Sequence, residues 1–206
     1  MYRAGLFFVI SAPSGTGKTS VIQRLKVKDP TLAVAISATT RQPRASETPG
    51  ESYHFMDESS FVSAIESFDF LEHTQIFAHR YGTLRGPLDM ATAHGTDTLL
   101  ALDWRGVKAL KDAYGDRVVA VFLLPPSLTE LGQRLNQRGQ DDPNNIAYRL
   151  RCAKEDLQDA VHYDYWVTNH VLDHAVDLIW AIVQSERCRL KHLHHPETLL
   201  DGVMNV

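Results

Sequence analysis

A short glycine-bearing stretch near the N-terminus limits the possible fold of this chain more than any other feature. The apolar run Leu6–Ile10 is typical of a strand that is buried on both faces. It leads into residues 11–19, SAPSGTGKT, after which apolar residues recur at helical spacing from Ser20 to Lys26. A strand, a tight loop and a helix in this order are the setting of a phosphate-binding P-loop.

The residue types of this loop suit the phosphates of a nucleotide. Glycines let backbone N–H groups converge on an anion, and the start of a helix adds unpaired N–H donors and the positive end of its dipole. Lys18 is expected to reach the β- and γ-phosphates, and the Thr19 hydroxyl to ligate Mg²⁺. The residues expected to bind ATP here are Ala12, Pro13, Ser14, Gly15, Thr16, Gly17, Lys18, Thr19 and Ser20.

One position departs from the P-loop pattern, which begins with glycine. Ala12 holds that place, and alanine fits only if the backbone there has a negative φ. The alternative is a strand-to-helix turn that merely contains glycine and lysine. We prefer the P-loop because loop, lysine, hydroxyl and flanking elements all agree.

Length, charge and cysteine content exclude several classes of protein. The 206 residues suit one domain, and a net charge of −4 argues against a dedicated nucleic-acid binder. Cys152 and Cys188 are too few for a disulfide framework, which favours a reducing compartment, the cytoplasm. We find no signal peptide and no apolar run long enough for a membrane span, so no membrane partner is expected.

Short apolar strands alternate with helices along most of the chain. This alternation predicts an α/β fold, a parallel sheet with helices on both faces. The stretch between Ala38 and Gly95 breaks the alternation and has the character of an inserted lobe. Gly115 is a predicted C-cap and Ser127 a predicted N-cap. Strands are expected at 32–37, 70–77, 98–103, 118–124 and 165–168, a turn at 80–83, and helices at 58–68, 87–94, 104–114, 127–137, 146–162 and 171–193.

Several motifs in one collinear order resemble the guanylate kinase family of P-loop nucleoside monophosphate kinases. They extend over residues 5–190 and, after the P-loop, comprise SATTRQPR (37–44), GESYHF (50–55), FLE (70–72), YGT (81–83), LDWRG (102–106) and RLNQRG (134–139). The resemblance implies transfer of the γ-phosphoryl group of MgATP to GMP, giving ADP and GDP. It also implies a single domain over 1–206, with a core at 1–37, 96–137 and 150–206, a GMP-binding lobe at 38–95 and a mobile lid at 138–149.

The loop at 37–44 suits the phosphate of a nucleoside monophosphate. Arg41 and Arg44 lie on one short loop, and guanidinium forks bind a phosphate dianion bidentately. Tyr53 and Tyr81 would add phenolic donors. The alternative is a solvated basic loop with both tyrosines packed against the core.

The resemblance also implies how guanine is chosen. Glu72 would accept hydrogen bonds from N1–H and the exocyclic amino group, and a site of this kind rejects adenine because its buried acceptors would stay unpaired. The alternative for Glu72 is an ordinary surface carboxylate. The full set that the resemblance places around GMP is Ser37, Arg41, Arg44, Tyr53, Glu72, Tyr81, Gly82, Thr83 and Asp103.

Further arginines match the family's lid. Arg138 and Arg149, with Lys18 and Arg41, are expected to stabilise the transferring phosphoryl group as catalytic residues. Arg134 is expected near ATP. For Arg134, Arg138 and Arg149 the alternative is a helix-surface position with salt bridges, which contribute little. Asn169 matches a family position near the adenine of ATP, and it equally suits a helix N-cap.

The chain departs from the family at three positions. The family usually has an acid two residues before Asp103, where this chain has Ala101, and this puts the Mg²⁺ shell in doubt. Arg105 stands for the usual glutamine, and His170 for an acid. The tail carries His192, His194 and His195, which suit either a frayed polar helix end or a metal cluster.

Two rival functions remain at this point, and the oligomeric state, monomer or homodimer, is open. One rival is a non-catalytic domain of the same family that binds a protein partner. Such domains have usually lost P-loop or lid residues, whereas Lys18, Thr19 and Arg138 are present here. The other is a P-loop kinase for a different small acceptor, which would not need the arginine loop beside Glu72.

Overall fold

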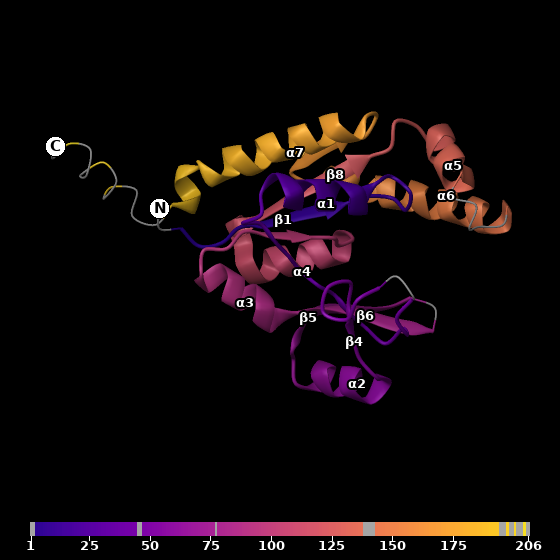
Figure 1. Ribbon diagram of the computed structural model, residues 1–206, viewed down its shortest axis with the longest axis horizontal. Coiled ribbons are helices and arrows are strands. Elements are labelled where there is room, and N and C mark those ends of the chain that lie inside the picture. The colour runs from indigo at the N-terminus through magenta and orange to yellow at the C-terminus, as the bar shows by residue number, and fades with distance from the viewer. Residues whose placement is uncertain are drawn as a thin grey trace.

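A sheet of five strands in the order β2-β7-β1-β8-β9 forms the centre of the fold (Figure 1). All of its pairings are parallel, as predicted. The computed structural model describes residues 3–44, 47–76, 78–137 and 143–193, together with residues 197, 200 and 204. The strands are β1 (Phe7–Ser11), β2 (Ala33–Val34), β7 (Thr98–Leu100), β8 (Val118–Leu124) and β9 (Tyr165–Thr168).

Helices cover both faces of this sheet, because successive side chains of the central strand β1 point to opposite sides. Phe8 and Ile10 pack against α1 (Lys18–Lys28) and α7 (Leu172–Arg187). Phe7 and Val9 pack against α3 (Arg85–Ala93) and α4 (Trp104–Tyr114) on the other side. Figure 1 shows the two pairs of helices on either side of β1, which confirms the predicted layers.

A second, smaller sheet lies beyond α3 and α4, in the lower part of Figure 1. Its strand order is β4-β3-β6-β5, and only the β3–β4 pairing is parallel. The helix α2 (Glu58–Glu66) packs on it through Phe61, whose ring stacks on Phe70 at 4.4 Å. The strands are β3 (Ala38–Thr39), β4 (His54–Phe55), β5 (Phe70–Ile76) and β6 (His79–Leu84).

The structure corrects the predicted turn at 80–83. These residues lie inside β6, which pairs antiparallel with β5, and the turn of the hairpin comes before His79. Gly82 suggested a turn, but it serves packing: a Cβ there would lie 2.7 Å from the ring of Phe70. Tyr81 and Thr83, on either side of it, are residue types that favour strands.

Two predicted strands are also shorter than expected. Of residues 32–37 only Ala33 and Val34 are strand, and Ala38 already belongs to the second sheet. The strand expected at 98–103 ends at Leu100. Asp103 instead caps α4, because its carboxylate accepts a hydrogen bond from the Gly106 N–H at 3.0 Å.

The helices α5 (Leu128–Gln137) and α6 (Pro143–Gln158) pack together through Leu131, Leu135, Ile146 and Ala153. The predicted caps are confirmed, since Ser127 Oγ accepts from the Glu130 N–H at 3.0 Å and Gly115 ends α4 with a φ of 58°. Short 3₁₀ turns are η1 (Gly115–Arg117), η2 (Asp159–His162) and η3 (Leu190–His192). Within the described residues, no helix has the length and apolar character to cross a membrane.

Phe68, just after α2, has a backbone conformation that suits glycine. Its φ is 57° and its residue surface is 84% exposed, so no burial offsets the strain. Left-handed backbone costs a residue with a side chain about 1–2 kcal/mol. We expect Phe68→Gly to raise the free energy of unfolding in urea by about 1 kcal/mol. The control is Ser67→Gly, at a right-handed position of the same turn, which should lower it; a destabilised Phe68→Gly would contradict the argument.

Candidate active site

The loop between β1 and α1 has the backbone that its glycines predict. Gly15 and Gly17 have φ angles of 94° and 106°, a region that residues with a Cβ rarely adopt. Ala12 is not among the described residues with positive φ, as its place in the loop requires. Because α1 begins at Lys18, the free N–H groups of its first turn point into the loop.

Side chains from distant parts of the chain hold this loop in place. Ser11 Oγ donates to the carbonyl of Leu102, and Asn169 Nδ2 donates to the carbonyl of Thr16 at 2.7 Å. A Cβ on Gly17 would lie 2.7 Å from Asn169 Nδ2. The N-cap of α7 is Val171, so Asn169 is not a helix cap. The cap alternative for Asn169 was therefore wrong, and its side chain supports the P-loop.

Lys18 is a half-buried cation of the site. Burial lowers its pKa, and the negative charges of Asp156 and Asp103 act in the opposite direction. No hydrogen bond from its ammonium group is found within the described part of the chain. A desolvated lysine without a hydrogen-bond acceptor gains much from an arriving phosphate.

Two adjoining cavities share this lysine. The first, of about 370 Å³, runs along the P-loop and is lined by residues 12–15, 17–20 and Asp156. The second, of about 450 Å³, also touches Ala12, Lys18 and Asp156, and extends to Asp103 and Tyr163. A larger cavity of about 500 Å³ contains no P-loop residue, and its Lys111 and Arg189 are already ion-paired.

The residues present fit a magnesium ion that arrives with a nucleotide. Thr19 lies in the first turn of α1, and four carboxylates line the adjoining cavity, those of Asp103, Glu155, Asp156 and Asp159. Among the described residues, no three His, Cys, Asp or Glu side chains form a metal site of their own. Mg²⁺ commonly uses one or two carboxylates, several waters and substrate phosphates, so it needs no such group.

The histidine-bearing tail gives no support to a metal cluster. His192 is buried and its Nε2 lies 3.0 Å from Glu186 Oε2, so one of the three histidines already has a partner. His194 and His195 lie outside the described residues.

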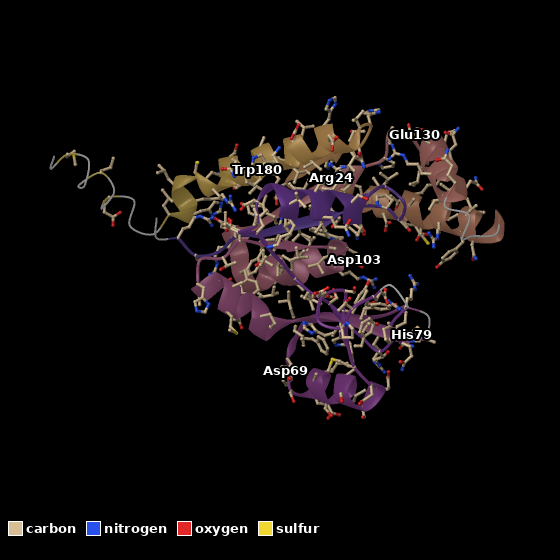
Figure 2. The ribbon with its side chains drawn as sticks, in the orientation of Figure 1. Arg24, Asp69, His79, Asp103, Glu130 and Trp180 are labelled. Carbon is tan, nitrogen blue, oxygen red and sulfur yellow. The ribbon has the colours of Figure 1, made fainter. Side chains whose placement is uncertain are left out.

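Glu72 and Thr83 meet across the β5–β6 hairpin, where they stand opposite each other in the register. Thr83 Oγ1 donates to Glu72 Oε1 at 2.6 Å. Burial raises the pKa of the Glu72 carboxyl, and the negative charge of Asp103 adds to this. Figure 2 shows Asp103 on the side of the core that faces the second sheet. Glu72 is thus no ordinary surface acid, and three of the predicted guanine-binding residues come together.

Ser37 lies beside this group as well. It is half-buried, and its carbonyl accepts from the His54 N–H at 2.9 Å, which places it at the start of the second sheet. Two of the residues at which the chain departs from the family, Arg105 and Ala101, lie close to Asp103 in space or in sequence. Arg105 lies 3.3 Å from the Asp103 carboxylate, and Ala101 is exposed, two residues before Asp103.

Arg41 is held by a partner that the sequence analysis missed. Its Nη2 lies 2.7 Å from Glu47 Oε1, and this hydrogen bond is the largest cause of the raised pKa of Arg41. The guanidinium group also lies over the ring of Tyr53, 5.4 Å from its centroid, and that ring contacts the ring of Tyr81. Arg44 is exposed, and its backbone N–H donates to Glu47 Oε2 at 2.8 Å. The solvated-loop alternative therefore fails for Arg41.

The remaining arginines differ in what the structure says of them. Arg149 Nη1 lies 3.5 Å from Ser14 Oγ, which brings α6 to the P-loop. Arg134 donates to Glu130 Oε1 at 2.6 Å and to the carbonyl of Asn169 at 3.0 Å, so the expected ion pair is present beside the P-loop support. Arg138 and the rest of 138–142 lie outside the described residues.

Asp156 and Glu47 are the site residues that the sequence analysis did not find. Asp156 lies in the last turn of a long helix, where nothing in the local sequence separates it from a surface acid. Glu47 follows Arg44 by three residues in a polar loop, and this proximity was the one available signal.

Comparison with known proteins gives one consistent result. The model of the family described as guanylate kinase matches residues 5–186. A guanylate kinase of Methylobacillus flagellatus is 40% identical over 185 residues, 90% of this chain and 91% of its own length. One of Maricaulis maris is 39% identical over 204 residues, 98% of this chain and 93% of its own. A crystal structure of guanylate kinase from Anaplasma phagocytophilum superposes with a TM-score of 0.81 at 27% identity, covering 99% of this chain and 97% of that one.

Proposed function

Because this chain belongs to the guanylate kinase family, we propose that the residues assembled above carry out the family's reaction in this protein. The protein is an ATP:GMP phosphotransferase, which transfers the γ-phosphoryl group of ATP to GMP. One observation supports the residue assignment most. Asp103 lines one cavity together with Lys18, and its negative charge also raises the pKa of the Glu72 carboxyl, so one carboxylate lies near both the P-loop and the proposed guanine site.

On the donor side, the P-loop backbone and Lys18 bind the phosphates of ATP. Lys18 offsets the negative charge of the γ-phosphoryl group as it moves, and Arg149, close to Ser14, adds a second positive charge. Arg138 joins them when residues 138–149 close as a lid. Arg134 and Asn169 lie at the nucleoside end of ATP, where Asn169 also supports the loop.

On the acceptor side, Arg41, Arg44, Tyr53 and Tyr81 bind the phosphate of GMP. Glu47 keeps Arg41 in place and shares it with the incoming phosphate. The second pKa of a phosphate is about 6, so the attacking oxygen is already ionised near neutral pH and no strong general base is needed. These residues therefore act by placing that oxygen in line with the γ-phosphorus.

Guanine is bound at the edge formed by Ser37, Glu72, Thr83 and Asp103. Glu72 accepts from the N1–H and the amino group, and Thr83 orients its carboxylate through the 2.6 Å hydrogen bond. Gly82 lets β6 lie close to the ring of Phe70, next to Thr83 of this guanine edge.

Magnesium is the cofactor that the donor site fits. Mg²⁺ bound to the ATP phosphates neutralises charge that develops during transfer. Thr19 would hold the ion through its hydroxyl, together with carboxylates that line the cavity adjoining the P-loop.

The proposed moving parts are the lobe at 38–95 and the lid at 138–149, within a single domain of 1–206. Both must close on the substrates, because water at the γ-phosphorus would hydrolyse ATP. We place the protein in the cytoplasm, in keeping with two free cysteines, as a monomer or homodimer without nucleic-acid or membrane partners.

A single assay tests the acceptor. ADP formation is followed with GMP, AMP, UMP and CMP in parallel, at saturating MgATP. GMP alone is expected to support turnover. Equal rates with AMP would exclude the guanine assignment, and ATP binding with no turnover on any acceptor would favour the non-catalytic rival.

Glu72→Gln is expected to lower kcat/KM for GMP. The loss should correspond to about 2–3 kcal/mol of transition-state stabilisation, the scale of a hydrogen bond to a charged group. The amide keeps the shape but turns one acceptor into a donor that opposes a guanine N–H. AMP, a poor substrate from the start, should lose little. Glu66→Gln, exposed on α2 of the same lobe, is the control that should leave both substrates unchanged. An unaltered ratio of GMP to AMP in Glu72→Gln would contradict the role of Glu72.

A further inference from the structure

Within the described residues, the cavity along the P-loop has one lining residue from outside the loop and the first turn of α1. Residues 12–15 and 17–20 line it on one side, and Asp156 of α6 lines it on the other. Asp156 also lines the adjoining cavity that leads to Asp103. Asp156 therefore borders the space that the phosphates of a bound nucleotide would occupy.

Negative charge gathers around Asp156. Burial raises the pKa of its carboxyl, and the nearby acids Asp103, Asp159 and Glu155 add to this, whereas Lys18 opposes it. Lys18, which donates no hydrogen bond within the described chain, is the group that the phosphates would engage. Once Lys18 pairs with a phosphate, Asp156 faces other carboxylates and phosphates, and a second cation is needed to stabilise the arrangement.

Three other carboxylates line this adjoining cavity, those of Asp103, Glu155 and Asp159, and the Asp103 carboxylate already has partners. One oxygen of Asp103 accepts from the Gly106 N–H and caps α4, and the other lies 3.3 Å from Arg105. At residue 101, after the end of β7, an exposed alanine offers no oxygen ligand. Of the four carboxylates that line this cavity within the described residues, Asp156 is the one that also lines the P-loop cavity, and no hydrogen bond to it is found in that part of the chain.

We propose that Asp156 is the acid through which this protein holds the Mg²⁺ that arrives with ATP, in the role that Ala101 cannot fill. Mg²⁺ keeps several waters when it binds to phosphates, and a carboxylate beside the P-loop can accept hydrogen bonds from them. The proposal rests on the proposed function for its cation, since it assumes that MgATP binds at the P-loop. Asp156 acts as a positioning residue, and it lies on α6, the helix that also carries Arg149.

The test measures ATP binding without GMP, by calorimetry, first in EDTA and then over a series of Mg²⁺ concentrations. Asp156→Asn is expected to bind metal-free ATP as well as the unaltered protein or better, because a negative charge beside the phosphates is gone. The Mg²⁺ concentration that gives half of the metal-dependent gain in affinity should rise about tenfold or more. Asp112→Asn removes the same charge from an exposed position of α4 and should change neither quantity.

A double variant separates this role from a structural one. Ala101→Asp in the Asp156→Asn protein is expected to bring the Mg²⁺ requirement back towards that of the unaltered protein. Asp156→Glu keeps the charge and should raise the requirement less than Asp156→Asn. An unchanged requirement in both Asp156 variants overturns the proposal. So does an equal loss of affinity with and without metal, which would assign Asp156 to Lys18 or to the fold.

Failure of the proposed function gives a different result. If the unaltered protein binds MgATP but does not phosphorylate GMP, the proposed function falls, while the metal dependence still decides the role of Asp156. If it binds ATP at no Mg²⁺ concentration, both proposals fall. Thermal unfolding of each variant shows that the comparison is made between folded proteins.

Discussion

Lys18→Met is expected to lower kcat for GMP phosphorylation by at least about a hundredfold, the cost of one preorganised charge aimed at a transition state. The substitution removes the ammonium group but keeps an unbranched side chain that suits the start of α1. Lys18 lines both P-loop cavities and is desolvated, so its charge acts there with little screening by water. The affinity for GMP should stay nearly unchanged, because Lys18 serves the donor.

Steady-state kinetics and GMP binding by calorimetry measure these two quantities separately. Lys28→Met, at the other end of α1, removes an exposed lysine whose partner is Asp177, and it should leave kcat unchanged. A Lys18→Met protein that keeps more than a tenth of kcat would exclude the role given to this lysine. A comparable loss of GMP affinity would mean that the effect spreads beyond the donor site.

Asp97→Asn is expected to lower the free energy of unfolding by about 3–5 kcal/mol, the cost of breaking a buried ion pair on one side. The Asp97 side chain is 2% exposed and accepts from Arg3, from Arg187 and from the Leu6 N–H. Arg187 also pairs with Asp29 at 2.8 Å. The amide would leave two guanidinium groups buried without their shared carboxylate.

Acid unfolding gives an independent check on the same network. The arginine and backbone hydrogen bonds outweigh the effect of burial and lower the pKa of Asp97 below its ordinary value. Its contribution to stability is therefore fully present above the ordinary carboxyl range and is lost as the pH falls through the lowered pKa. The Asp97→Asn protein should lose less stability over that acid range. Asp177→Asn, in the exposed pair with Lys28, is the control and should change little in either measurement.

The sequence predicted the core of this fold because its signals there are local. The run Leu6–Ile10 is apolar at every position, as strands covered on both faces are, and the glycines of the following loop occupy left-handed backbone in the structure. The caps at Gly115 and Ser127 were also predicted, since each depends on one residue and its immediate neighbours.

The second sheet was harder to predict because its pairings decide its structure. Gly82 is typical of a turn, yet it lies within β6, where the ring of Phe70 across the hairpin excludes a side chain. The two-residue strand at Ala38 and Thr39 is stabilised by neighbours some 40 positions away, which no local pattern reveals.

Site residues with a distinctive motif were predicted, and those that act from a helix or loop by position alone were not. Glu72 and Thr83 belong to quoted motifs and are bonded to each other. Asp156 and Glu47 acquire their surroundings only when α6 reaches the P-loop and when the arginine loop folds back on itself. Neither of these contacts can be predicted from the residues next to Asp156 or Glu47 in the sequence.

The order of strands in the main sheet has a consequence for how this protein is synthesised. Of the five strands in this sheet, the central one, β1, is synthesised first, and its neighbours β7 and β8 follow only after residue 97. Until they emerge, the strand that carries Phe7, Phe8 and Ile10 has neither of its partner strands, and exposed apolar surface with unpaired strand edges is what makes incompletely folded chains prone to aggregate. The hydrogen bond from Asn169 forms later still, so the P-loop gains this support only after residue 169 has been synthesised.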